Sequence, residues 1–160
     1  MFKNNFNPLT PPEKIYLPDG TELRLCVGAV PRQGHAKLYC SAMGIFFSLS
    51  SRGLNQIKCY HVKNFKAKPN VHSYYPRMCG FIGNPYCHLL VAIAWIGPRR
   101  FNHECHHLNG NHTDNRASNL IWLTHTEHLR FDAALKKGVV LEHHDPAEIM
   151  EEDMTHHREF

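Results

Sequence analysis

Short apolar runs separated by turn residues occupy the first half of the chain. Residues 23–30, 37–40, 44–49 and 57–65 are rich in apolar and β-prone residues, and Gly, Pro and Ser interrupt them. In the last run, Lys58 and Lys63 punctuate a mostly apolar stretch, as expected for a half-buried strand. This pattern predicts several short strands between residues 21 and 83. Residues 1–20, rich in Asn and Pro and ending in a Pro-Asp-Gly turn, predict an extended arm that adds little to the core.

The next segment has the apolar pattern and the boundaries of a buried helix. Asn84 suits the N-cap, Pro85 suits the first helical position, and Gly97 with Pro98 provides a stop. The large apolar residues between these signals form a wide surface: Leu89, Leu90, Ile93, Trp95 and Ile96. We therefore expect a core helix, with Arg99 and Arg100 just beyond its C-terminal end.

A strand, a turn, a second strand and a helix are expected to follow. Asn109-Gly110 is a turn signal after a short strand that ends near residue 107, and residues 120–123 form a second apolar run. Thr124 then stands at an N-cap, and Glu127 occupies the capping-box position three residues later. This order predicts a β-turn-β-helix unit. Similar N-cap signals near residue 145 predict a short acidic helix to about residue 154.

Together these elements predict an α+β protein with four parts. Residues 1–20 form the arm, residues 21–83 a short β-rich region, residues 84–135 the core helix with the ββα unit, and residues 136–160 an acidic tail. With 160 residues, 42% of them hydrophobic, the chain is able to build a packed core. No apolar run reaches membrane-spanning length and the N-terminus has no apolar signal core, so we expect no membrane partner and a cytosolic location.

The formal net charge of +4 is unevenly distributed. Residues 142–160 hold seven acidic residues and one basic residue, which leaves 17 Lys and Arg against 7 Asp and Glu in residues 1–141. A basic body favours a polyanionic partner such as nucleic acid, although simple solubility charge also accounts for it. Basic and aromatic residues alternate further along, which suits either phosphate and base contacts or a solvated hairpin: Lys63, Phe65, Lys66, Lys68, Tyr74, Tyr75 and Arg77.

The six cysteines form neither CxxC pairs nor the dense spacing of a disulfide scaffold, so we expect reduced thiols. Convergence of Cys59, His61, Cys79, Cys87 and His88 on a structural zinc is one hypothesis. Buried cysteines that act as small apolar side chains are the alternative.

Six of the fourteen histidines lie between residues 103 and 128. Adjacent strand residues point to opposite faces, so one of His106 and His107 is able to bind a metal ion while the other stays free as a general base. His128 lies one turn into the following helix and is able to reach back to the metal, and Asp132 on the same helix face is a candidate third ligand. Phosphodiester hydrolysis needs such a base and a positive charge beside the phosphate.

At this point the chain resembles a known family. Residues 105–132 resemble the HNH endonuclease motif of the ββα-metal class. Phage HNH homing endonucleases are similar in particular, through His88 to Ala92, Trp95-Ile96, His107 to Asn111, Asn115-Arg116, Asn119-Leu120 and Trp122 to Thr124. A weaker likeness upstream is to the small β module that often precedes the nuclease motif in those proteins: Tyr39-Cys40-Ser41, Gly44 and Phe47-Ser48-Leu49.

The resemblance implies a role for each residue of the motif. His106 occupies the first metal-ligand position, where phage homing members often have Asp or Asn, and His107 matches the general base. Asn119 matches the central Asn, which braces the loop and helps to orient the base, and His128 matches the second ligand. Asp132 stands where colicin-type nucleases have a further His, which is a departure. One divalent ion is implied, Mg²⁺, Mn²⁺, Zn²⁺ or Ni²⁺, and two imidazoles suit the last three better than a carboxylate-rich Mg²⁺ site would.

The expected activity is therefore metal-dependent hydrolysis of double-stranded DNA to 5′-phosphate and 3′-hydroxyl ends, by a nicking, homing-type enzyme. The β-rich region is expected to bind DNA. The residues expected to contact DNA are Arg116, Arg99 and Arg100 near the motif, and Lys63, Lys66, Lys68 and Arg77 upstream.

Other interpretations stay open on the sequence alone. The main alternative is a zinc-stabilised, sequence-specific DNA-binding module without cleavage, and a closed zinc site completed by Cys105 or His103 is one form of it. An inactive HNH fold is another alternative. A homodimer or a larger phage assembly, with the acidic tail as a docking or autoinhibitory segment, also fits, and a phage-encoded protein would act in the host cytoplasm.

Overall fold

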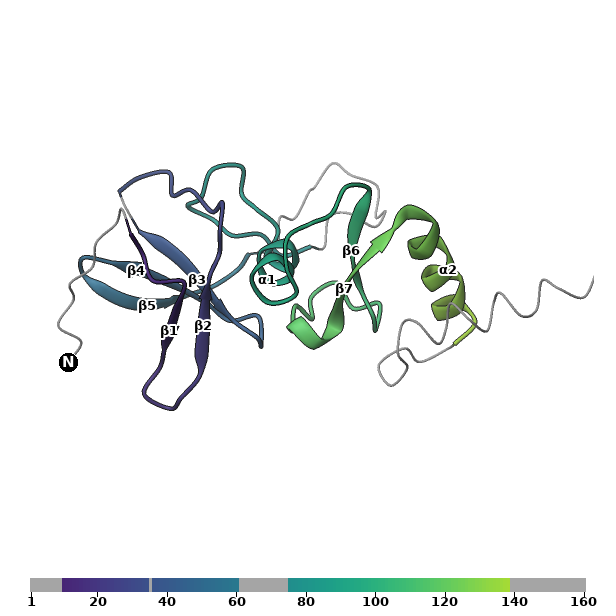
Figure 1. The fold of residues 1–160 in the computed structure, drawn as a ribbon, viewed down its shortest axis with the longest axis horizontal. Helices are drawn as coiled ribbons and strands as arrows, with labels where there is room; N and C mark the ends of the chain where they lie inside the picture. Colours follow the sequence, from purple (N-terminus) through teal and green to yellow (C-terminus); the bar gives the residue numbers. More distant parts are fainter. Residues whose placement is uncertain (1–9, 35, 61–74, 139–160) are drawn as a thin grey trace, which may run out of the picture.

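The computed structural model describes residues 10–34, 36–60 and 75–138, and every structural statement below concerns these residues. Several expectations lie outside them, including those for Lys63, Lys66, Lys68, the zinc candidate His61 and the acidic C-terminal helix. The described elements follow one another along the long axis of an elongated molecule (Figure 1). A sheet occupies one end, a central helix follows, and a hairpin with a second helix occupies the other end.

The N-terminal sheet is an antiparallel meander, in which each strand pairs with its neighbours in sequence. Its strands are β1 (Lys14–Tyr16), β2 (Glu22–Leu25), β3 (Lys37–Ser41), β4 (Phe46–Ser50) and β5 (Gly53–Ile57). Side chains alternate across the buried strand β3. Tyr39 packs in one apolar cluster with Leu23, whereas Leu38 and Cys40 belong to a second cluster. The sheet therefore has apolar side chains on both faces.

Two parts of the strand prediction were wrong. Residues 14–16 are not an arm: they form β1, because Ile15 packs against the cluster of Tyr39, whose hydroxyl also donates to the carbonyl of Pro12 at 2.8 Å. Of the strand expected at residues 57–65, only Ile57 lies in a strand, as the last residue of β5; residues 58–60 belong to no strand, and residues 61–65 lie outside the described residues. Tyr60 forms only an isolated bridge with Arg77. The strand that pairs with β4 is instead residues 53–57.

The central helix α1 (Cys87–Trp95) is the predicted core helix. Cys87, Leu90, Val91 and Ala92 are buried in it, and α1 contacts both the sheet and the hairpin. The helix ends before Gly97 as predicted, but it starts later than Asn84. Asn84 lies in a left-handed turn with φ of 45°, and its side chain accepts a hydrogen bond from Arg32 at 3.0 Å, so it is not the N-cap.

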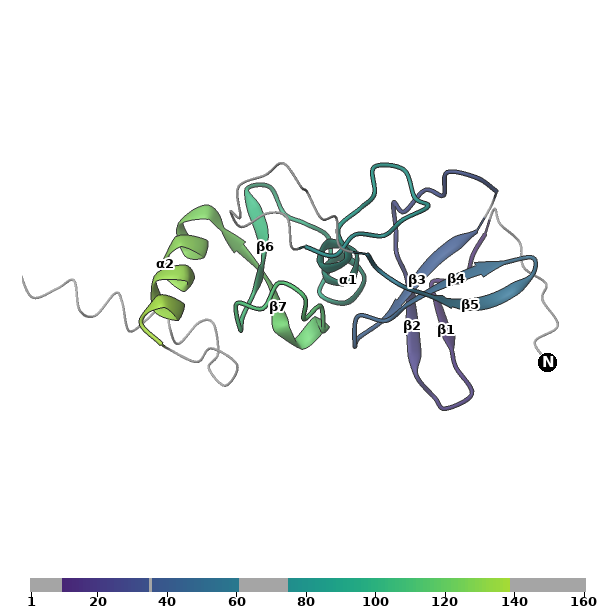
Figure 2. The ribbon, with the colours of Figure 1, turned by 180° about the vertical axis from the view of Figure 1, so that it is seen from behind.

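The predicted ββα unit is present beyond α1 (Figure 2). It consists of β6 (His103–His107), the short 3-10 helix η2 (Ala117–Asn119), β7 (Leu120–Thr124) and α2 (His125–Lys136). The predicted capping box is formed: Thr124 N donates to Glu127 Oε2 at 2.7 Å, and Glu127 N donates to Thr124 Oγ1 at 3.4 Å.

One apolar cluster joins the two ends of the molecule. It contains Leu38 and Phe46 from the sheet, Leu90 from α1 and Leu120 from β7. The predicted α+β class, with a β-rich region followed by a core helix and a ββα unit, is therefore confirmed. Within the described residues, no helix has the length and apolar character needed to cross a membrane.

Candidate metal centre and active site

Strand β6 separates the two adjacent histidines onto opposite faces. The ring of His106 lies 4.7 Å from that of His128 and 5.8 Å from that of Phe131, both on α2. The ring of His107 instead lies 5.2 Å from that of His88 on α1. This is the arrangement expected from the two-residue period of a strand.

His106, His128 and Asp132 come together as a group of potential metal ligands. Each offers one ligand atom, and these atoms lie within 4.8 Å of one another. The four-residue spacing places His128 and Asp132 on one face of α2. Phe131 fixes that face, because its side chain is fully buried against Leu123. In the part of the chain that the structure describes, no other group of three such side chains converges in this way.

The chemistry of this group fits a divalent cation. Burial, with a smaller contribution from the neighbouring His128, lowers the pKa of His106 to about 4, so its ring is neutral near pH 7 and has a free lone pair. Among the described residues, no partner hydrogen-bonds to the buried His106 Nε2. The nitrogen that faces the carboxylate of this group is Nδ1 of the same ring, 3.9 Å from Asp132 Oδ1. Two imidazoles and a carboxylate are a common ligand set for first-row transition metals.

Glu104 is a neighbour of this group that the sequence analysis did not single out. It lies two residues before His106 on β6, so both side chains share a face. One oxygen of Glu104 lies 3.5 Å from His128 Nδ1 and the other lies 3.8 Å from His125 Nδ1. A carboxylate beside a ligating imidazole is well placed to orient the ring. The two-residue strand period was the signal that would have found it.

A side-chain amide holds the ring of His107 in one tautomer. His107 Nε2 lies 3.1 Å from the Asn115 side-chain oxygen. Because a carbonyl oxygen only accepts, Nε2 carries the proton and Nδ1 keeps the lone pair of a base. Burial lowers the pKa of His107, and the hydrogen bond that its ring donates to Asn115 partly offsets this effect. The ring is therefore neutral and able to accept a proton near pH 7.

Aromatic rings cover His107, which is only 2% exposed. Tyr75 and His112 stack on each other at 4.4 Å, and their ring centres lie 5.8 and 5.6 Å from that of His107. His88 lies on the α1 side of His107, and burial lowers the pKa of His88 to about 3. His88, which contacts His107, therefore stays uncharged well below neutral pH.

Asn119 braces the loop between the two strands. Its side-chain oxygen accepts from Asn109 N at 3.0 Å, and its amide donates to Asn109 Oδ1 at 2.9 Å and to the Asp114 carbonyl at 2.8 Å. The resemblance implied that Asn119 also helps to orient the base, but the amide that contacts His107 belongs to Asn115. Asn115 was expected only as a residue of the motif, without this role.

The described basic residues expected at DNA differ in their surroundings. Arg116 forms an ion pair with Asp114 at 2.6 Å, which lowers the pKa of Asp114 to about 2. Arg99 donates to the His103 carbonyl at 2.6 Å and lines a surface hollow of about 370 Å³ together with Glu104 and His125. Arg100 is exposed. Arg77 lies over the Tyr86 ring at 4.0 Å and also donates to its hydroxyl, so this side chain already has a structural contact.

The zinc hypotheses gain no support from the described residues. All six cysteines are free, Cys79 is exposed, and neither Cys59, Cys87 nor His88 joins a ligand group of three. Cys105 packs against the apolar core and is not part of the His106 group, and neither is His103. A closed tetrahedral shell around His106 and His128 is therefore not formed by the residues first considered for it.

The chain was compared with known protein families, curated proteins and solved structures. No curated protein matches the chain. A solved structure described as DNA binding and cleavage by the HNH homing endonuclease I-HmuI is similar, with 23% sequence identity, a TM-score of 0.45 and coverage of 64% of this chain. The chain spans about half of that protein's length, 53%. Residues 86–130 match the model of a family described as HNH endonuclease. The family match thus falls on the segment where the sequence analysis expected the HNH motif, in the second half of the chain.

Proposed function

We propose that this chain is a metal-dependent endonuclease that hydrolyses double-stranded DNA and leaves 5′-phosphate and 3′-hydroxyl ends. One observation carries the proposal: His106, His128 and Asp132 converge on one face of β6, while the adjacent His107 is held as a neutral base on the other face. Because His106 and His107 are adjacent on β6, the ligand group and the base lie next to each other along the strand.

His106, His128 and Asp132 would hold the cation. When bound, the ion supplies positive charge at the phosphate and at the leaving 3′-oxygen. Phe131 keeps the two α2 ligands in place, and Glu104 beside His128 orients its ring. The predominance of imidazole favours Mn²⁺, Zn²⁺ or Ni²⁺ over Mg²⁺.

His107 would remove a proton from the attacking water through Nδ1. Its lowered pKa keeps the ring neutral at physiological pH, which a general base requires. Asn115 accepts the hydrogen bond from Nε2 and so holds the ring in the required tautomer, and it also stabilises the imidazolium that forms. Because Tyr75 and His112 cover His107, this pair has to move aside when the substrate arrives.

The remaining details of the proposal concern the DNA. Arg99 and Arg100 lie at the turn before β6, close to the hollow that Glu104 and His125 also line, and we assign them to phosphate contacts. The β-rich region would add further contacts on the same duplex. One active site per chain predicts nicking by a monomer, whereas double-strand cleavage needs two copies. A phage origin and a cytoplasmic location stay predictions.

A plasmid assay tests the proposal. Supercoiled plasmid is incubated with the full chain in Mg²⁺, Mn²⁺, Zn²⁺ or Ni²⁺, each with and without EDTA, and the nicked product is treated with DNA ligase. Metal-dependent nicking that ligase reseals is the expected result, because ligase joins 5′-phosphate to 3′-hydroxyl ends. Tight, salt-dependent DNA binding with no cleavage in any metal would instead support the zinc-stabilised DNA-binding module.

A further inference from the structure

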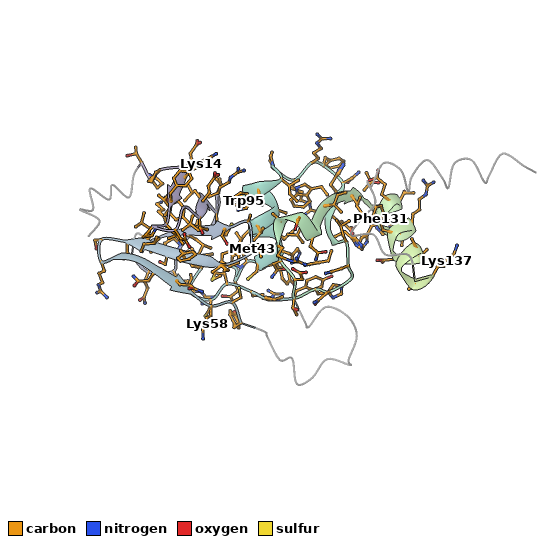
Figure 3. The ribbon with its side chains drawn as sticks, turned by 90° about the horizontal axis from the view of Figure 1, so that it is seen from below. Lys14, Met43, Lys58, Trp95, Phe131 and Lys137 are labelled. Atoms are coloured by element: carbon orange, nitrogen blue, oxygen red, sulfur yellow. The ribbon has the colours of Figure 1, made fainter. Side chains whose placement is uncertain are left out.

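The turn between β3 and β4 presses against the loop of the ββα unit, although about seventy residues separate them in sequence. Ala117 N donates a hydrogen bond to the Ala42 carbonyl at 2.8 Å. Gly44 in the same turn approaches Asn115, the residue whose side chain contacts His107. Figure 3 shows Met43, which lies between Ala42 and Gly44, near the middle of the elongated molecule. The turn thus connects the sheet with the catalytic loop.

This contact leaves no room for a side chain at residue 44. A Cβ built on Gly44 would lie 2.7 Å from the Asn115 carbonyl oxygen, 3.0 Å from its carbonyl carbon and 3.2 Å from its Cβ. Real Cβ atoms essentially never come within 3.0 Å of such atoms, and two of these three belong to the backbone. Seven other glycines with positive φ have nothing within 4 Å of the same position. The close approach therefore distinguishes Gly44 from these seven glycines.

Hydrogen bonds hold both segments that meet at this contact. The turn is closed by hydrogen bonds from Gly44 N to the Ser41 carbonyl at 3.0 Å and from Ser41 N to the Ile45 carbonyl at 2.9 Å. On the other side Asn115 is buried, and Asn119 ties the preceding residue Asp114 to the loop. A methyl group at residue 44 would consequently displace the backbone of Asn115 and, with it, the amide that holds His107.

We propose that Gly44 is a positioning residue for the general base. By letting the β3–β4 turn pack directly on Asn115, it fixes the Asn115 side chain and so the tautomer of His107. The proposal rests on the proposed nuclease function for its kinetic consequence. Its structural consequence, a single His107 tautomer with the proton on Nε2, is independent of that function. The N-terminal sheet would thus act in catalysis through a contact that does not touch the substrate.

The first test compares two glycine variants. Gly44 and Gly83 have nearly the same φ, 73° and 76°, so both Gly44→Ala and Gly83→Ala place a side chain in the left-handed region, but only the first meets Asn115. In the full chain, Gly44→Ala is expected to lower kcat for plasmid nicking by about 10- to 100-fold with KM within about 3-fold, since small misplacements of catalytic groups have effects of this size. Gly83→Ala is expected to keep the wild-type kcat. Equal kcat values for the two variants would overturn the proposal.

The second test needs no cleavage. The ¹⁵N shifts of the His107 ring in the DNA-free chain report which nitrogen carries the proton. Wild type and Gly83→Ala are expected to show a single form with the proton on Nε2, and Gly44→Ala a mixture. If wild type shows this single form yet cleaves nothing in any metal, the proposed function fails and the positioning inference stands. If Gly44→Ala keeps the wild-type ring shifts, the positioning inference fails whatever the activity.

A third variant covers the case in which Gly44→Ala does not fold. Ala117→Pro removes the donor to the Ala42 carbonyl, and Ala117 is the first residue of η2, where proline is tolerated. Arg116 before it has φ of −59° and ψ of 137°, which suits the residue before a proline. A weaker change in the same direction, about 3- to 10-fold in kcat with a mixed His107 tautomer, is expected. Wild-type values of both quantities in Ala117→Pro would overturn the proposal.

Discussion

Replacement of Glu127 tests how the ββα unit secures its ligand helix. Glu127 Oε2 accepts hydrogen bonds from Thr124 N at 2.7 Å and from Thr124 Oγ1 at 2.8 Å, at the N-terminus of the helix that carries His128 and Asp132. Glu127→Ala removes both bonds and a negative charge at the positive end of the helix dipole. Glu127→Gln is the matched control, because it keeps the shape and one amide oxygen but loses the charge.

The magnitude follows from the type of interaction. Loss of an N-terminal cap costs about 0.5–2 kcal/mol, and a charge in the first turn contributes about 0.3–1 kcal/mol when exposed. Glu127 is only partly buried, so in Glu127→Ala water replaces part of the hydrogen bonding that Thr124 loses. We expect Glu127→Ala to lower the free energy of unfolding by about 1–2 kcal/mol at pH 7, and Glu127→Gln by about half of that.

The effect should depend on pH in a defined direction. The hydrogen bond from the Thr124 backbone lowers the pKa of Glu127 from its ordinary value of 4.5. A carboxyl with a lowered folded-state pKa stabilises the fold fully above its unfolded value, and this contribution is lost as pH falls through the folded-state pKa. The gap between wild type and Glu127→Gln should therefore be complete at pH 6–7 and shrink as the pH is taken below 4.5.

Urea unfolding followed by circular dichroism measures both effects, and the difference between variants at each pH cancels the titration of other carboxyls. A wild-type minus Glu127→Gln gap that stays constant from pH 7 to pH 3 would refute the reasoning. So would a Glu127→Ala variant within about 0.3 kcal/mol of wild type at pH 7.

Three further predictions concern the loop and the metal ligands. Asn119→Ala leaves Asn109 N and the Asp114 carbonyl without their partner, and urea unfolding should show a free energy of unfolding lowered by about 2–4 kcal/mol. A decrease below about 1 kcal/mol would mean that other contacts hold the loop. Arg116 lowers the pKa of Asp114 to about 2, so the stabilisation of the fold by this pair should be complete above pH 3.8 and be lost only as pH falls through about 2. An Asp114→Asn variant should therefore be less stable than wild type at pH 4, and equal free energies of unfolding at that pH would contradict this. Asp132→Asn should weaken Zn²⁺ or Mn²⁺ binding by about 10- to 100-fold in calorimetric titration, and unchanged affinity would remove Asp132 from the ligand group.

The parts of the site that could be predicted from the sequence lie close together in the chain. His106, His128 and Asp132 span fewer than thirty residues, and the strand period, the turn at Asn109-Gly110 and the capping box at Thr124 together determine their relative placement. Each of these signals is local, and each agrees with the others. The central helix followed from equally local signals, although its first residue was misplaced by the unusual turn at Asn84.

The rest depended on contacts between distant segments. β1 forms because Ile15 packs beside Tyr39, which no local pattern in an Asn- and Pro-rich stretch indicates. The choice of Asn115 over Asn119 as the partner of His107 depends on how the loop folds across the strand ends. The contact between Gly44 and Asn115 spans about seventy residues and is visible only when both ends of the molecule pack on α1.

Single-turnover nicking by a His107→Ala variant tests the central claim most directly. His103→Ala is the matched control, since it also removes an imidazole from β6 but from a residue outside the ligand group, whose ring bonds to the Phe101 carbonyl. With Mn²⁺ and saturating plasmid, His107→Ala should nick about 10²- to 10⁴-fold more slowly than wild type while its calorimetric metal affinity stays unchanged, because the base is lost and the ligands are not. Nicking by His107→Ala at the wild-type rate would contradict the account.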